Sequence, residues 1–220
     1  MVERKKLAVL ISGRGSNMEA IYNATCTQGY PAEICIVISD NEDAGGLNFA
    51  RSNEIKAAAF ERKAFEDRNE HEQAICEAID ASGADIVVLA GYMRILSKPF
   101  VERYEGRLLN IHPSLLPAYK GLDTHGRVLE DGAKIHGCTV HFVNSEMDGG
   151  AIIAQAAVPV LSGDTESDLA TRVLKCEHQL YSRVISLLAT EQIRLVEGGV
   201  KFDDIPSIDG NDSLFSIDIM

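Results

Sequence analysis

The first half of the chain alternates short apolar runs with longer amphipathic stretches. The apolar runs are rich in Val, Ile, Leu and Ala and end at turn signals, which is typical of buried strands. They lie at 6–12, 33–39, 57–60, 84–91 and 107–112. The stretches with helical spacing lie at 16–28, 46–54 and 67–82. This alternation predicts an α/β fold, a doubly wound and mostly parallel sheet with helices on both faces.

The second half has a different pattern. Residues 136–143 and 151–160 alternate between two faces and are joined by a loop that contains glycines. Two such segments predict antiparallel strands added to the sheet in the C-terminal half. Residues 163–192 predict a long helix with an Asp or Thr cap. Its apolar positions are Leu169, Val173, Cys176, Leu180, Val184 and Leu187 or Leu188.

The end of the chain is polar, acidic and without periodicity. It contains Pro206 and Gly210, so we expect a mobile acidic tail at 203–220. Residues 1–202 are expected to form one domain. Its N-terminal half covers about 1–105 and its C-terminal half about 106–202.

Charge and cysteine usage narrow the class of protein. The 220 residues carry a formal net charge of −12, and such an acidic surface repels phosphate backbones, so nucleic acid is not expected as a partner. The five cysteines lack CxxC spacing, which argues against a zinc site or a disulfide framework and favours the reducing cytoplasm. The apolar runs are too short to span a membrane, and the start, MVERKKLAVLISG, predicts a first strand rather than a signal peptide.

The segment ISGRGSN, residues 11–17, lies between the first predicted strand and the first predicted helix. Gly13 and Gly15 allow a tight turn, after which the N–H groups of Gly15, Ser16 and Asn17 can bind an anion at the helix N-terminus. Neither nucleotide motif is met, because Met18 replaces the third glycine of a dinucleotide fingerprint and no GK[ST] follows. An ordinary strand-to-helix turn with Ser16 as N-cap explains the same residues.

The segment LLNIHPSLLPAYKG, residues 108–121, carries the strongest chemical candidates. His112 lies at the carboxyl end of a predicted strand, where open α/β sheets bind their ligands. Asn110 is two residues earlier and therefore on the same side of the strand. An amide and an imidazole placed together can stabilise an oxyanion in acyl transfer, and Pro113 would keep the loop rigid. Two side chains that merely cap a strand end fit the same pattern.

Three charged side chains are further candidates. Asp148, in the segment MDGG, is the best carboxylate, because a carboxylate near an imidazole stabilises its charged form. An ordinary Asp-Gly hairpin turn would use the same residues. Arg68 and Arg94 lie near predicted strand ends, where they could meet an anionic ligand or simply solubilise the surface.

The remaining histidines are ambiguous. His141 shares a strand face with Thr139 and fits a buried core residue as well as a site residue. His125 and His136 are expected in turns. No pair has metal-ligand spacing with a carboxylate, so we predict no catalytic metal.

Six segments stand in an order and spacing that point to one family. They are ISGRGSN, VLAGYMRIL, LLNIHPSLLPAYKG, HGCTVHFV, MDGG and QAAVPV. With them the chain resembles the phosphoribosylglycinamide formyltransferases, a branch of the folate-dependent formyltransferase superfamily, from about residue 6 to residue 190. The block N-x-H-P-S-x-L-P followed by D-G-G is highly specific to that superfamily.

The resemblance implies an activity. It implies a Rossmann-like formyltransferase fold and a cytoplasmic enzyme of purine biosynthesis, acting as a monomer or homodimer on small molecules without a membrane. Such an enzyme transfers the formyl group of 10-formyltetrahydrofolate to the amine of glycinamide ribonucleotide. The half at about 1–105 would bind the phosphate, and the half at about 106–202 would carry the folate and catalytic chemistry.

The resemblance also implies roles for individual residues. The catalytic residues would be Asn110, His112 and Asp148. The ribonucleotide would be bound by Gly15, Ser16, Asn17 and Glu177. The formyl donor would be bound by Arg68, Met93, Arg94, Ile95, Leu96, Asn110 and His141. One departure is Leu174, because some relatives have glutamine there, near the substrate.

Other functions fit parts of this pattern. A formyltetrahydrofolate hydrolase uses the same catalytic logic with water as acceptor, but such enzymes carry an extra N-terminal regulatory domain. A methionyl-tRNA formyltransferase needs a C-terminal nucleic-acid-binding domain and a basic surface. A non-catalytic phosphate-binding module would explain GRGSN but would leave Asn110, His112 and Asp148 unrelated.

Overall fold

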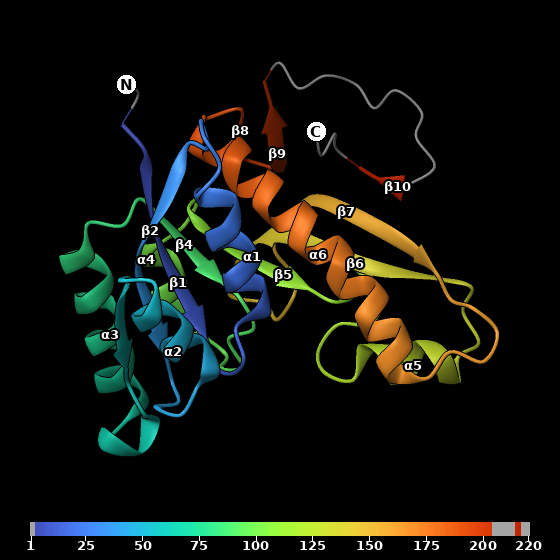
Figure 1. The fold of residues 1–220 in the computed structure, drawn as a ribbon, viewed down its shortest axis with the longest axis horizontal. Helices are drawn as coiled ribbons and strands as arrows, with labels where there is room; N and C mark the ends of the chain where they lie inside the picture. Colours follow the sequence, from blue (N-terminus) through green and yellow to red (C-terminus); the bar gives the residue numbers. More distant parts are fainter. Residues whose placement is uncertain (1–2, 204–213, 217–220) are drawn as a thin grey trace. The chain divides into compact units, whose positions relative to one another are not determined.

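The computed structural model describes residues 3–203 and 214–216 of the chain (Figure 1). Along the sequence these residues divide into two compact units, Met1–Asn110 and Ile111–Met220. Most of the tail predicted to be mobile, residues 204–213 and 217–220, lies outside the described residues. In the described part, no helix has the length and apolar character needed to cross a membrane.

The first unit is built on five parallel strands. In spatial order they are β3 (Lys56–Ala59), β2 (Ala32–Ser39), β1 (Lys5–Ile11), β4 (Ile86–Leu89) and β5 (Leu108–His112), whose last two residues open the second unit. β1 pairs with β2 on one side and β4 on the other, so its residues 7–11 are fully buried. A strand covered on both faces needs a continuous apolar run rather than alternation. All five predicted strands are therefore confirmed.

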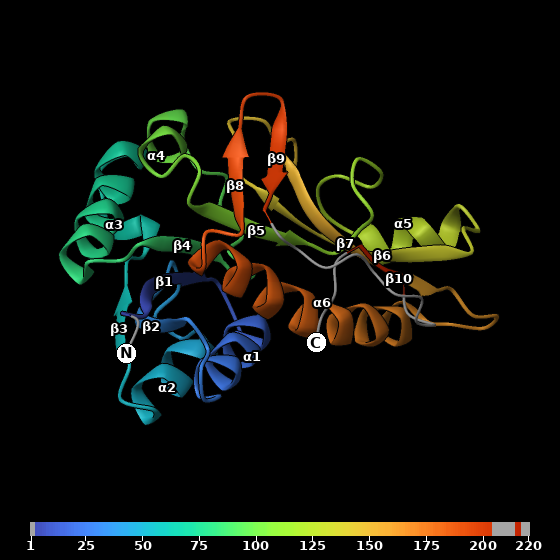
Figure 2. The ribbon, with the colours of Figure 1, turned by 90° about the horizontal axis from the view of Figure 1, so that it is seen from above.

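Helices cover both faces of these strands, as the fold prediction requires. Figure 2 shows α1 (Ser16–Thr25) and α2 (Gly45–Ser52) on one face and α3 (Arg68–Ser82) and α4 (Lys98–Arg103) on the other. A short 3₁₀ turn, Arg62–Ala64, precedes α3. The side chain of Asp67 caps α3 by accepting from the N–H of Glu70 at 2.9 Å, and Gly83 ends it in the left-handed conformation.

The second unit contains the antiparallel strands. β6 (Ile135–Phe142) pairs with β7 (Ile152–Pro159), and β10 (Leu214–Phe215) pairs with the other edge of β7. The β6–β7 pairing has a bulge, because Val140 faces Ala154 while His141 faces Ile152. A separate hairpin is formed by β8 (Ile193–Val196) and β9 (Gly199–Phe202). The antiparallel strands thus lie in the C-terminal half, as predicted.

Two helices complete the second unit. Figure 1 shows α6 (Glu166–Ala189) lying along β7 and β6, while α5 (Thr124–Glu130) also packs against α6. Thr165 and Asp168 cap α6 with reciprocal hydrogen bonds, a capping box. The predicted apolar stripe is buried at most of its positions. Of the alternatives Leu187 and Leu188, Leu187 is the buried one. The prediction is wrong at Cys176, which is half-buried, whereas the neighbouring Glu177 is buried.

Candidate active site

The glycine loop between β1 and α1 takes its shape from one of its two glycines. Gly15 has φ +84°, and a Cβ added there would lie 3.0 Å from the Cα of Gly46. Gly13 has no atom within 4 Å of the corresponding position. The turn therefore requires glycine at Gly15 and leaves room for a side chain at Gly13. Gly15 is also the N-cap residue of α1 and makes no side-chain cap bond, so the reading of Ser16 as N-cap is wrong.

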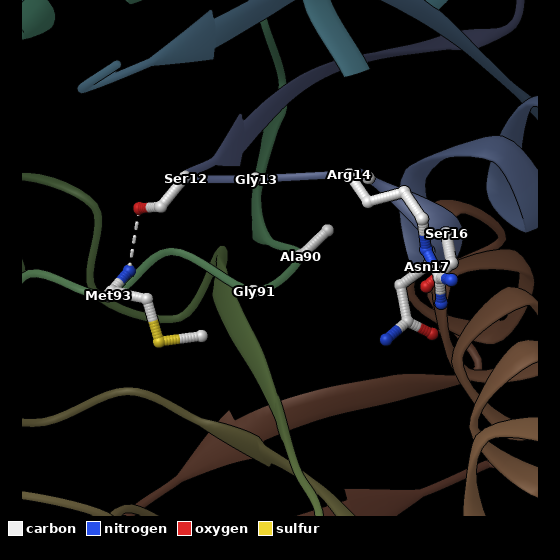
Figure 3. Close-up of a pocket in the computed structure, with 9 residues that line it drawn as sticks. Ser12, Gly13, Arg14, Ser16, Asn17, Ala90, Gly91 and Met93 are labelled. Atoms are coloured by element: carbon white, nitrogen blue, oxygen red, sulfur yellow. Dashed lines mark hydrogen bonds between the residues drawn. The ribbon is translucent and has the colours of Figure 1, made fainter. Parts of the chain in front are cut away.

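A cavity of about 280 Å³ opens in front of this loop (Figure 3). Ser16 and Asn17 lie at one end of it and Met93 at the other. The Ser12 hydroxyl accepts from the N–H of Met93 at 2.8 Å, which fixes the two sides of the cavity to each other. Its lining residues are Ser12, Gly13, Arg14, Gly15, Ser16, Asn17, Ala90, Gly91 and Met93. Because the N-terminus of α1 borders the cavity, the N–H groups of its first turn and the helix dipole suit a bound anion.

The segment Met93–Leu96 runs on from this cavity with its side chains largely outside the core. Met93 is 68% exposed and Ile95 70%, while Leu96 is half-buried. Arg94 donates from Nε to Asp40 at 2.5 Å, and the Arg94 side chain remains 52% exposed. The segment therefore presents its backbone and one partly free guanidinium to a ligand.

Arg68 is tied to two neighbours although its side chain is 47% exposed. Its Nε donates to Glu72 at 2.8 Å and its Nη2 donates to the carbonyl of Ile95 at 2.5 Å. The structure therefore brings Arg68 to the Met93–Leu96 segment. These two bonds use two of the five N–H groups of the guanidinium.

Asp40 and Tyr92 are two buried polar residues that the sequence did not single out. Asp40 Oδ1 and the Tyr92 hydroxyl are buried atoms without a hydrogen-bond partner among the described residues. Burial, with the nearby Asp40 carboxylate, raises the pKa of Tyr92, so the phenol stays protonated. The signal available in the sequence was their place near strand ends, because Asp40 directly follows β2 and Tyr92 comes three residues after the end of β4.

His112 is the last residue of β5 and is buried, with 6% of its surface exposed. Its Nε2 lies 3.0 Å from the carbonyl oxygen of Tyr119, which can only accept, so this nitrogen donates. Its Nδ1 lies 3.5 Å from Oδ2 of Asp148, which accepts from the N–H of Gly121 at 2.8 Å. Both imidazole nitrogens therefore face acceptor oxygens.

Asp148 reaches His112 from an unusual backbone conformation. It lies in the β6–β7 loop with φ +49°, and 12% of its side chain is exposed. Asn110 lies two residues before His112 on β5, so both side chains leave the same face of that strand. The structure thus brings together His112 and Asp148, which sequence reasoning linked only through their order in the chain.

Two further histidines lie near His112, and the prediction that they occupy turns is wrong. His125 lies in α5 and His136 in β6, with their Nδ1 and Nε2 atoms 3.1 Å apart. Burial, helped by the neighbouring His125 and His112, lowers the pKa of His136 to about 4. Burial also lowers the pKa of His125. His136 lies inside the strand that was predicted at 136–143, and it is almost fully buried there.

His141 and Glu177 are both buried in the second unit. His141 Nδ1 donates to the Phe142 carbonyl at 2.8 Å, and burial lowers the pKa of His141. Glu177 is 6% exposed on α6, and its charge raises the pKa of Cys138 after the larger effect of burial. Within residues 3–203 and 214–216, no group of three His, Cys, Asp or Glu side chains is arranged to hold a metal ion.

Comparisons with known proteins find one family. A family model described as Formyl transferase matches residues 5–185. The phosphoribosylglycinamide formyltransferase of Escherichia coli (strain K12) is 46% identical over 197 residues, which are 90% of this chain and 93% of that protein. The match therefore extends over both units.

Solved structures give the same result. Glycinamide ribonucleotide transformylase 1 from Symbiobacterium toebii aligns with a TM-score of 0.89 at 43% identity, covering 91% of this chain and 95% of that chain. A phosphoribosylglycinamide formyltransferase from Brucella melitensis aligns with a TM-score of 0.82 at 52% identity, covering 85% of this chain and 96% of that chain.

Proposed function

Because the chain belongs to the formyl transferase family, we propose that it transfers the formyl group of 10-formyltetrahydrofolate to the amine of glycinamide ribonucleotide, in purine biosynthesis. The family predicted from the sequence motifs is thereby confirmed. The relatives named above carry this acceptor and this reaction in their names. Glycinamide ribonucleotide and the folate are small molecules, and the enzyme acts in the cytoplasm as a monomer or homodimer.

The observation that carries the proposal is the His112–Asp148 pair. The imidazole is buried, one nitrogen is 3.5 Å from the carboxylate, and the other donates to a backbone carbonyl. A hairpin aspartate in an ordinary turn would face solvent, whereas Asp148 is directed at the end of β5. In the proposal, the imidazole supplies a hydrogen-bond donor to the developing oxyanion, and the carboxylate holds the imidazole in place.

In the reaction, the amine of the ribonucleotide forms a bond to the formyl carbon and the bond from that carbon to the folate nitrogen breaks. Asn110 donates its amide hydrogen, and His112 a ring hydrogen, to the oxyanion of the tetrahedral intermediate. Asp148 balances the charge of His112 and, through a water, helps move the proton from the attacking amine to the leaving nitrogen. For His112 to reach the oxyanion, the substrate competes with the Tyr119 carbonyl, the present acceptor of Nε2.

The remaining site residues bind the two substrates in this proposal. The N–H groups of Gly15, Ser16 and Asn17 hold the ribonucleotide phosphate, and Glu177 holds its ribose. The backbone of Met93, Arg94, Ile95 and Leu96 binds the pterin ring, together with His141. Arg94 and Arg68 meet the glutamate end of the donor, Arg94 with the part of its guanidinium that Asp40 leaves free. No metal takes part.

The proposal is tested by following the loss of 10-formyltetrahydrofolate with and without glycinamide ribonucleotide. Loss that depends on the ribonucleotide, with the formylated ribonucleotide as product, is the expected result. Loss at the same rate without the acceptor would identify a hydrolase. No loss under either condition would leave a phosphate-binding module and reject the proposal.

A further inference from the structure

Glu72 is a buried carboxylate that belongs to none of the roles assigned above. It lies in the second turn of α3 with 7% of its surface exposed. Its Oε1 accepts from Arg68 Nε at 2.8 Å and from the N–H of Ser97 at 3.0 Å. Its Oε2 accepts from the hydroxyl of Ser97. A buried charge is tolerated only when donors surround it, and here donors come from α3 and from the start of α4.

The two partners of Glu72 both act on the Met93–Leu96 segment. Ser97 follows the segment directly and is the N-cap of α4. Arg68 uses its second donor on the carbonyl of Ile95, inside the segment. A guanidinium is planar, so fixing Nε on Glu72 also fixes the direction in which Nη2 points.

The segment needs such support because its own side chains do not anchor it in the core. Met93 and Ile95 are each more than two-thirds exposed. Its beginning is tied by the bond from the Met93 N–H to Ser12 Oγ and by the Arg94–Asp40 ion pair. The bonds to Ile95 and Ser97 tie its end, and all of these pass through Glu72 or its partner Arg68.

We propose that Glu72 is a positioning residue for the formyl donor. By orienting Arg68 and Ser97, it holds the backbone of Met93–Leu96 in the shape that binds the pterin ring. The inference rests on the proposed function, because that function makes this segment the donor site.

The test is Glu72→Gln, which keeps the shape and an acceptor oxygen but removes the charge that orients Arg68. We expect the KM for 10-formyltetrahydrofolate to rise about five- to twentyfold, with kcat and the KM for glycinamide ribonucleotide within about twofold of wild type. Tetrahydrofolate binding, measured by calorimetry without turnover, should weaken by a similar factor. Glu72→Asp, which keeps the charge on a shorter side chain, should recover part of the loss.

The matched control is Glu102→Gln, which removes the carboxylate of an exposed i,i+4 pair with Lys98 on α4. It should leave both KM values unchanged. If Glu72→Gln is too unstable to purify, Ser97→Ala removes only one hydroxyl from the same network and should raise the KM for the folate alone.

Equal changes in both KM values, or folate binding indistinguishable from that of Glu102→Gln, would overturn the proposal and leave Glu72 as a packing residue. Wild-type protein that turns over neither substrate would instead reject the proposed function. The two failures are therefore separate.

Discussion

The glycine loop of the first unit and the His112–Asp148 pair of the second offer different chemical groups to a ligand. The loop offers backbone N–H groups at the start of α1, and its shape depends on the absence of a side chain at Gly15. The pair consists of two side chains that are almost completely buried. Both follow strand ends, but one binds through the backbone and the other through ionisable groups.

This difference determines which kind of substitution damages each region. A backbone site is damaged by adding atoms, because a new Cβ meets a neighbour or forces an unfavourable φ. A side-chain site is damaged by removing a group or its charge, even when the shape is kept. Substitutions chosen in opposite directions should therefore separate the binding contribution of the loop from the chemical contribution of the pair.

The largest effect is expected from the pair. His112→Ala should lower kcat on the order of a thousandfold, because it removes a donor to the oxyanion. Asp148→Asn should lower kcat about a hundredfold, because it removes the carboxylate that supports His112 and helps to move the proton. Asn at 148 can still accept from the N–H of Gly121, so its fold should be preserved. Single-turnover kinetics with both substrates saturating measures the chemical step. Near-wild-type transfer by either variant contradicts the assignment.

A smaller effect, in binding rather than chemistry, is expected from the loop. Gly15→Ala places an L residue at φ +84° and its Cβ 3.0 Å from Gly46, which should cost about 1–2 kcal/mol of stability. Because the N–H groups then shift, the KM for glycinamide ribonucleotide should rise about tenfold or more, while the KM for the folate changes little. Gly13→Ala is the control, since nothing lies within 4 Å of its added Cβ. Equal effects at both glycines would show that loop shape does not determine phosphate binding.

The last effect is expected in stability rather than in turnover, and it arises in the second unit, where pH changes the charge of a buried histidine. Backbone N–H groups do not titrate in the physiological range, but the buried His136 has its pKa lowered from 6.5 to about 4. Above pH 6.5 this histidine is neutral in both the folded and unfolded states, so its contribution to stability is complete. As the pH falls from 6.5 toward 4, the unfolded chain takes up the proton first, and stability should fall by on the order of 2–3 kcal/mol.

Urea unfolding measured between pH 7.5 and pH 4.5 checks this. His136→Asn should show a shallower loss of unfolding free energy over that interval than wild type. A wild-type curve no steeper than that of the variant would show that His136 does not titrate between the two states.

The parallel core could be predicted well from the sequence, because burial on both faces of a strand produces a recognisable sequence pattern. A run such as residues 7–11 must be apolar at every position, and the long α6 must repeat its apolar residues at helical spacing.

Short helices have few residues, and their sequence pattern is therefore harder to recognise. The helix α5 follows Gly121 and contains Gly126. Because glycine is unfavourable in helices, the sequence pattern did not predict this helix. α4 could have been found from Ser97 and Pro99, since a capping serine with proline in the first turn is typical of a helix start.

The residues of the candidate site could be predicted from the sequence, but the contacts that these residues make could not. Asn110 and His112 were recognisable because a strand end precedes a proline. Periodicity does not show that Arg68 is held by Glu72, or that a lone Glu177 is buried in an apolar stripe. Long-range pairings such as these depend on which loops meet after folding, and no local pattern records that. The role of each predicted site residue remains a proposal that the substitutions above test.

The bulge at Val140 and His141 has a consequence for how this part of the chain can change over evolution. It leaves Ile153 as an extra residue on β7, just beyond the loop that carries Asp148. Successive side chains in a strand point to opposite faces of the sheet. Deleting that one residue would therefore move the neighbouring side chains to the opposite face relative to the partner strand. Inherited insertions and deletions should therefore be rare between His141 and Ala154. They should be tolerated instead at the turn between β8 and β9, where a Cβ added at Gly198 or Gly199 would meet no atom within 4 Å.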